Sequence, residues 1–256
     1  HLNNTQGVML EAEKLMAEAM GADKSYFLTN GTTIGIIAMI LSVCKANDKV
    51  ILPRNVHKSV INALILSGAM PIFIMPNIDQ NIGIANDISF EAAKKVIDDN
   101  PEATAIFIIN PTYFGVVSAM QKITEYAHEK GLVVMADEAH GAQFYFSNKL
   151  PISAMEAGVD ISATSMHKTA GSLTQSSILL TQGPRIDHQR LRATLNMLLS
   201  TSPSSLLIAS LDVARKTMFF QGKSKIKHIL DLAKIAREKL KNIKGIQVIG
   251  KEYLLE

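Results

Sequence analysis

The chain has 256 residues, of which 47% are hydrophobic and 19% charged, as is typical of a folded globular protein. Lys and Arg total 26 against 23 Asp and Glu, and this small surplus is spread along the chain, so neither nucleic acid nor a strongly charged protein is indicated as a partner. The longest apolar run, residues 34–44, is too short for the roughly 20 residues that span a bilayer.

Short β-rich runs alternate with longer helical ones in the first two thirds of the chain. The expected strands are 25–29, 49–53, 70–75, 103–109, 132–137, 160–164 and 176–181. The expected helices are 32–44, 57–67, 89–98 and 119–130. Because the strands are continuously apolar and separated by helices, we predict an α/β domain with a mostly parallel (mixed) central sheet and helices on both faces.

From residue 186 onward the pattern becomes helical. Apolar residues in 223–244 recur at spacings of three and four: Ile226, Ile229, Ala233, Ala236, Leu240 and Ile243. This spacing predicts a helix with one buried stripe and basic residues elsewhere. We interpret it as a solvated connector helix, and a membrane-binding or calmodulin-binding helix is the alternative.

Ligands of such sheets bind at the carboxyl ends of the strands, so the polar residues that follow the strands are candidate site residues. The first group is residues 29–33 (TNGTT), between a strand and a helix. Gly31 permits a tight turn, and the hydroxyls of Thr32 and Thr33 join free N–H groups at a helix start, which suits a phosphate. A plain turn followed by a helix N-cap is the alternative.

The second group is residues 137–141 (DEAHG), at the end of strand 132–137. These letters coincide with the DEAH box of helicases, but that interpretation requires a preceding phosphate-binding GxxxxGK[ST] loop. The Gly-Lys-Ser at 222–224 follows the acidic pair and has Thr217 in place of the first glycine, which excludes this ATPase motif. Asp137 therefore either stays ionised beside a cationic partner or caps the following turn.

Two further groups contain a lysine and histidines. Lys168 follows strand 160–164 beside His167; desolvated there and near a cation, its amine would be neutral enough to form a Schiff base, whereas an ordinary exposed lysine is the alternative. His57 begins a helix, and it would either stack on a flat ring in the same crevice or serve only the helix.

Together, a phosphate site, a carboxylate and a Schiff-base lysine at one sheet edge are what pyridoxal 5′-phosphate (PLP) requires. Their order resembles that of the fold-type I, aspartate-aminotransferase-like PLP enzymes. Within that group, the sequence more closely resembles the PLP-binding major domain of the Orn/Lys/Arg decarboxylase family, and the resemblance extends from Gly7 to about Phe220. The segments that carry this resemblance are ADKSYFLTNGTT, PRNVHKS, INPTYFG, ADEAHGAQF, SMHKTAGSLTQ and LLSTSPSSLLIASLD.

The resemblance implies a role for each candidate residue. Lys168 would be the Schiff-base lysine, and Asp137 the partner of the pyridine nitrogen. His57 would stack on one face of the ring, with Ala139 beneath the other. The phosphate site would comprise Gly31, Thr32, Thr33 and Ser165. His140 and His167 also match the family, and Lys168 or His167 would return a proton to Cα.

The resemblance further implies PLP-dependent decarboxylation of arginine, lysine or ornithine to a polyamine-pathway amine, in a cytoplasmic homodimer or multiple of dimers. It places residues 201–203 near the dimer interface, and Ser205 departs from the tyrosine frequent among relatives. We expect a small-molecule amino-acid substrate, with no nucleic acid, membrane or metal. The alternatives are a PLP aminotransferase or lyase, and a non-catalytic binding or regulatory relative.

The ends of the chain and its one cysteine complete these expectations. We expect a PLP-binding large domain at 1–222, and at 223–256 a connector helix with the start of a truncated C-terminal domain. The initial His1 also suggests a piece of a longer protein. Cys44, inside an apolar run, fits a reducing cytoplasm.

Overall fold

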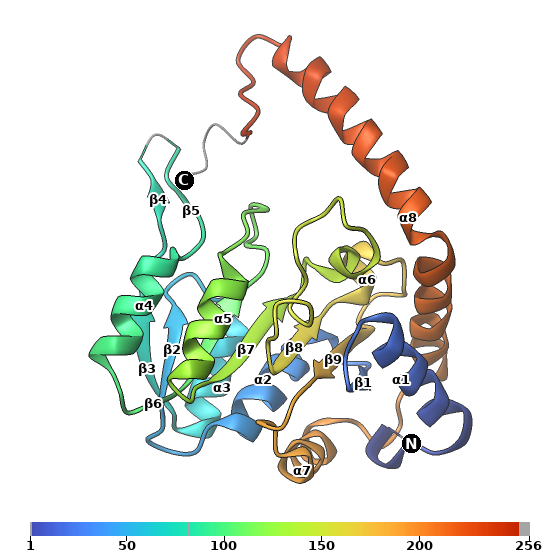
Figure 1. Cartoon of the computed structure of the whole chain (residues 1–256). Helices are drawn as coiled ribbons and strands as arrows, with labels where there is room; N and C mark the ends of the chain where they lie inside the picture. The colour runs from blue at the N-terminus through green and yellow to red at the C-terminus, as the bar shows by residue number, and fades with distance from the viewer. Residues whose placement is uncertain (1, 81, 251–256) are drawn as a thin grey trace.

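A seven-stranded mixed sheet forms the centre of the computed structural model, which describes residues 2–80 and 82–250 (Figure 1). The strand order is β1 (Lys24–Leu28), β9 (Ser177–Thr181), β8 (Ile161–Thr164), β7 (Val133–Glu138), β6 (Ala103–Ile109), β2 (Lys49–Pro53) and β3 (Met70–Ile74). β9 is antiparallel to both of its neighbours, and the other pairs are parallel. The predicted mostly parallel sheet is thereby confirmed.

The register of the sheet brings three strand ends to one edge. Asp137 near the end of β7 lies opposite Ile109, the last residue of β6, and opposite Ala163 of β8. The loops that follow these strands therefore begin side by side, where ligands of α/β sheets bind.

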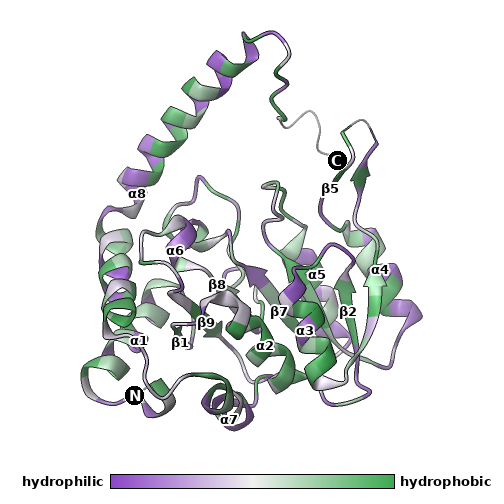
Figure 2. Ribbon diagram, turned by 180° about the vertical axis from the view of Figure 1, so that it is seen from behind, coloured by the Kyte–Doolittle hydropathy of each residue, from purple (hydrophilic) through white to green (hydrophobic). Residues whose placement is uncertain are grey.

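Helices cover both faces of the sheet. α2 (Gly31–Val43) packs on one face together with α3 (Lys58–Ser67) and α7 (His188–Leu198), and α4 (Phe90–Asp99) and α5 (Met120–Glu129) cover the other (Figure 1). α2 is apolar almost all round because the sheet, α3 and α7 surround it, and Figure 2 shows the same hydrophobic colour on α2 and the central strands. Gly35 allows the close packing, since a Cβ there would lie 2.8 Å from Leu28 Cδ1.

Several described elements have no counterpart among the predicted ones. They are η1 (Leu2–Asn4), α1 (Gly7–Ala19), the hairpin of β4 (Ile78–Asp79) and β5 (Ile84–Ala85), η2 (Ala142–Phe146) and the short α6 (Met166–Thr169). The buried face of α1 contains the polar Glu13, whose carboxylate accepts hydrogen bonds from the Phe27 N–H (3.1 Å) and the Thr5 hydroxyl (2.8 Å). A charged residue on the buried face interrupts the apolar periodicity that predicts helices.

α8 (Ser205–Lys241) is one continuous helix, and the expected boundary between residues 222 and 223 falls inside it. The predicted buried stripe is wrong in this structure: Ile226 is 4% exposed, but Ile229 is 61% and Ile243 49% exposed. The physical reason is that the second half of α8 extends away from the sheet (Figure 1). No described helix combines the length and the hydrophobicity needed to cross a membrane.

Candidate active site

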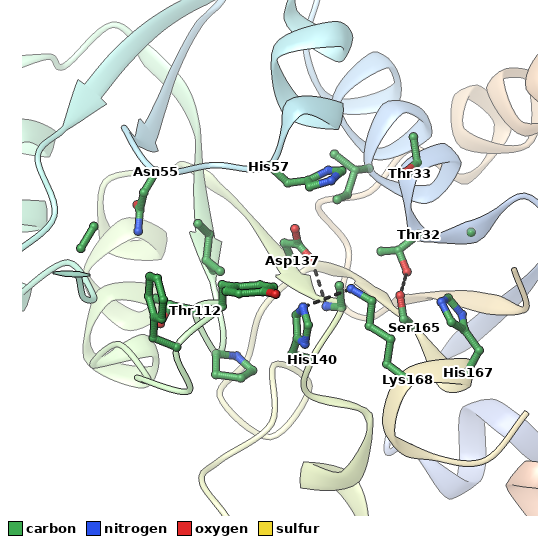
Figure 3. Close-up of a pocket in the computed structure, with 18 residues that line it drawn as sticks. Thr32, Thr33, Asn55, His57, Thr112, Asp137, His140, Ser165, His167 and Lys168 are labelled. Carbon is green, nitrogen blue, oxygen red and sulfur yellow. Dashed lines mark hydrogen bonds between the residues drawn. The ribbon is translucent and has the colours of Figure 1, made fainter. Parts of the chain in front are cut away.

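A cavity of about 380 Å³ lies at the carboxyl ends of β6, β7 and β8. It is lined by every residue that the family resemblance assigned to the cofactor site: Gly31, Thr32, Thr33, His57, Asp137, Ala139, His140, Ser165, His167 and Lys168. Figure 3 shows that the labelled ones come from widely separated segments. The polar residues that follow the strands therefore lie together in one site, as expected for ligand sites of such sheets.

The predicted phosphate site lies at the start of α2. Gly31 has a φ of +72°, which favours glycine, and its N–H donates to the Gln175 carbonyl oxygen (2.8 Å). The Thr32 hydroxyl hydrogen-bonds the Ser165 hydroxyl and donates to that of Ser177 (3.1 Å). Two hydroxyls and a helix N-terminus therefore meet here, an arrangement that favours an anion.

Asp137 is the carboxylate of the cavity and is only 6% exposed. Burial raises the pKa of Asp137, and the hydrogen bond from the Ala139 N–H (2.9 Å) and the charge of Lys168 offset this only in part. Asp137 thus both caps the turn after β7 and faces the cavity, so the two interpretations of the sequence are compatible. A cation close to this carboxylate would favour its ionised form.

Lys168 lies on α6 with its Nζ 3.1 Å from His140 Nε2 (Figure 3). The expected desolvation of this lysine is wrong, because its side chain is exposed between the site cavity and a second cavity of about 640 Å³ beside α8. Burial, and secondarily the charge of Lys168, lowers the pKa of His140, which favours the neutral imidazole.

The other two histidines have different local partners. His57 is the N-cap of α3, and its Nδ1 accepts a hydrogen bond from the Ser59 N–H (3.2 Å). His167 Nδ1 donates to the Ser176 carbonyl oxygen (2.9 Å). Figure 3 shows His57 and His140 on opposite sides of Asp137, with His167 beyond Ser165.

The sequence argument assigned no role to the remaining lining residues, which are Ile36, Asn55, Ala85, Ile109, Pro111, Thr112, Tyr113 and Phe114. Four of them, Pro111, Thr112, Tyr113 and Phe114, belong to the loop after β6, whose Asn110 N–H donates to the Asp137 carbonyl oxygen (2.9 Å). Tyr113 contacts His140 edge-to-face, with ring centroids 5.7 Å apart at 85°. This loop could have been predicted to line the site, because it directly follows the carboxyl end of β6.

Glu138 lies behind the cavity and is completely buried. Its carboxylate accepts hydrogen bonds from the Ala154 N–H (2.9 Å), the Ser162 hydroxyl (3.0 Å), the Asn110 amide (3.3 Å) and the Tyr145 hydroxyl. Burial nevertheless raises its pKa to about 7. Glu138 thus connects four segments around the site without lining the cavity.

The sequence and the structure are similar to those of known proteins. The arginine decarboxylase of Bacillus subtilis (strain 168) is 46% identical over 253 residues, which are 99% of this chain and 52% of that protein. The chain therefore spans about half the length of the curated relatives it matches.

Two solved structures have the same fold. Lysine decarboxylase A from Pseudomonas aeruginosa has a TM-score of 0.85 at 27% identity, over 97% of this chain and 37% of that one. A structure of SPT with PLP has a TM-score of 0.65 at 15% identity, over 82% of this chain and 51% of that one, which shows the fold alone.

The family model of the Orn/Lys/Arg decarboxylase major domain matches residues 1–256. With the identities above and the arrangement of the cavity, this match shows that the chain belongs to the Orn/Lys/Arg decarboxylase family and has the fold of PLP-dependent transferases.

Proposed function

We propose that this protein decarboxylates a basic amino acid with PLP as its cofactor. The observation that carries the proposal is that all the residues that the family resemblance assigned to the cofactor site line one cavity of a chain in this family. The names of the relatives support a basic amino acid, with arginine decarboxylases at 43–46% identity and a lysine decarboxylase at 31%.

The chemistry of the lining residues fits PLP. The hydroxyls of Thr32 and Ser165 at the start of α2 suit a phosphate. Asp137 is a buried carboxylate whose ionised form needs a cation, and a protonated pyridine nitrogen is such a cation. Lys168 presents a primary amine to the same cavity.

When bound, PLP supplies an aldehyde that bonds to amines and a cationic ring that accepts the electron pair released at Cα. Asp137, if ionised, would favour a protonated ring nitrogen, and His57 and Ala139 would contact the ring. Thr32, Thr33 and Ser165 would hold the phosphate. Lys168 would supply the amine for the aldehyde, and Lys168 or His167 would be the proton donor to Cα.

The cofactor is tested by adding PLP to the apoprotein. We expect the visible absorption of lysine-bound PLP in the wild type and its loss in Lys168→Ala. As a matched control, Lys149→Ala removes an exposed lysine that does not line the cavity, and it should keep the absorption. Equal spectra for the wild type and Lys168→Ala would refute the assignment.

The reaction is tested by supplying arginine, lysine and ornithine to the PLP-loaded protein. We expect one equivalent of carbon dioxide for each amine formed, and no keto acid. Keto-acid formation would indicate an aminotransferase, and PLP binding without turnover of any of the three would favour a non-catalytic relative. Arginine is the first substrate to test, because the relatives at 43–46% identity are named arginine decarboxylases.

We also propose a cytoplasmic homodimer or multiple of dimers, which light scattering would measure. The buried, free thiol of Cys44 supports a reducing compartment. Residues 201–203 are proposed to lie near the subunit interface, and the division of the chain near residue 222 is likewise a proposal.

A further inference from the structure

Lys168 and His140 form a contact that the proposed reaction has not yet used. Lys168 lies on α6 and His140 in the turn after β7, and Lys168 Nζ lies 3.1 Å from His140 Nε2. A protonated Lys168 can only donate a hydrogen bond, and in that state Nε2 is the acceptor and a neutral His140 carries its proton on Nδ1.

The surroundings of His140 favour this neutral form. The imidazole is half-buried, and both its burial and the charge of Lys168 lower its pKa. The other titratable side chains that line the cavity are His57, Tyr113, Asp137 and His167. At neutral pH the lone pair of Nε2 is therefore available to the lysine.

The ring of His140 is itself supported by the loop after β6. Tyr113 meets it edge-to-face, with the ring centroids 5.7 Å apart, and the Tyr113 side chain is 82% exposed. A side chain so exposed contributes little to the core. Its described ring contacts are the one with His140 and an edge-to-face contact with its neighbour Phe114, with the centroids 5.6 Å apart.

A lysine that binds an aldehyde and later gives it up to a substrate amine is free during part of each cycle. Its four-carbon stem then has many rotamers, and most of them direct Nζ away from the reacting atoms. A fixed acceptor beside Nζ restricts these rotamers.

We propose that His140 is a positioning residue that holds the free amine of Lys168 at the cavity through Nε2, and that Tyr113 fixes the His140 ring for this purpose. The positioning role rests on the proposed PLP function, whereas the contact between His140 and Lys168 is tested on the protein alone.

The first test uses the apoprotein and follows the His140 ring by NMR as the pH is varied. We expect the pKa of His140 to rise in Lys168→Met, because a neighbouring positive charge has been removed. The matched control is Lys149→Met, in which His140 should titrate as in the wild type. An unchanged His140 pKa in a folded Lys168→Met protein would overturn the contact.

The second test follows the rate at which the apoprotein captures PLP, read from the absorption of lysine-bound PLP. His140→Phe keeps a ring beside Tyr113 but removes the acceptor, and we expect capture about tenfold slower, as for the loss of one charged hydrogen bond. His140→Gln retains an acceptor and should recover most of the rate. Tyr113→Ala should capture PLP more slowly than Tyr113→Phe, because only the phenyl ring keeps the edge-to-face contact with His140.

The outcomes separate the two proposals. If His140→Phe captures PLP as fast as the wild type, the positioning role is refuted although PLP binding stands. If the wild type itself never forms lysine-bound PLP, the proposed function fails, and the NMR titration still decides whether His140 and Lys168 are paired.

Discussion

The buried carboxyl of Glu138 should make the free energy of unfolding depend on pH, and the substitution Glu138→Gln should remove this dependence. In Glu138→Gln, the amide oxygen can accept from Asn110 and the Ala154 N–H. The amide nitrogen can donate to the hydroxyls of Tyr145 and Ser162, which accept once they rotate. All these partners are kept, so the variant should differ from the wild type mainly in having no charge at this site.

The magnitude follows from the pKa of Glu138, which burial raises from 4.5 to about 7. At about 1.4 kcal/mol per pKa unit, the full effect is about 3 kcal/mol. Because the folded-state pKa is the higher one, this contribution to stability is fully present below pH 4.5 and is lost as the pH rises through 7.

Urea unfolding of both proteins between about pH 5 and 8 measures the effect. We expect the wild type to lose most of the 3 kcal/mol relative to Glu138→Gln over this range, with about equal stability at the acidic end. Glu156→Gln, which alters an exposed carboxyl on a neighbouring loop, should show no such divergence from the wild type. If the difference between the wild type and Glu138→Gln stays constant with pH, the argument from burial is refuted.

Two further predictions concern the cavity. Asp137→Asn should still capture PLP, but carbon dioxide release should fall on the order of 100-fold or more, because the ring nitrogen loses its anionic partner; a normal rate would remove Asp137 from the mechanism. Thr32→Val should weaken PLP binding about tenfold in equilibrium dialysis, because a hydroxyl that contacts Ser165 is replaced by a methyl group of similar size. Unchanged affinity would place the phosphate elsewhere.

The strands and the cavity residues were predictable because their signals are local. Continuous apolar runs indicate buried strands, and the residues after them must meet at one edge of a parallel sheet. Asp137, Thr32 and Lys168 were therefore identified from chain position and residue type together. The hydrogen bonds that attach loops to strands, such as the one from the Asn110 N–H to the Asp137 carbonyl oxygen of β7, depend on register and cannot be predicted from residue spacing.

Other features could not be predicted, for physical reasons. The position of Tyr113 after β6 could have been noted in the sequence, but its contact with His140 arises only because two loops fold together. Helix α1 was not predicted because Glu13 interrupts its apolar pattern. The Glu13 carboxylate can be buried there because the Phe27 N–H and the Thr5 hydroxyl donate hydrogen bonds to it. In α8 the apolar spacing correctly indicates an amphipathic helix, but spacing does not say which neighbour covers the apolar face.

The consecutive carboxylates of β7 make the alignment of this strand decisive for the chemistry. Neighbouring residues of a strand point to opposite faces, so Asp137 faces the cavity while Glu138 meets the hydroxyls and amides behind it. A slip of β7 by one residue against β6 and β8 would exchange these two environments. Glu138 would then face the cavity, and the shorter side chain of Asp137 would be too far from the four groups that donate hydrogen bonds to Glu138. The pairing of three strands thus decides which of two similar acids can serve a bound cation.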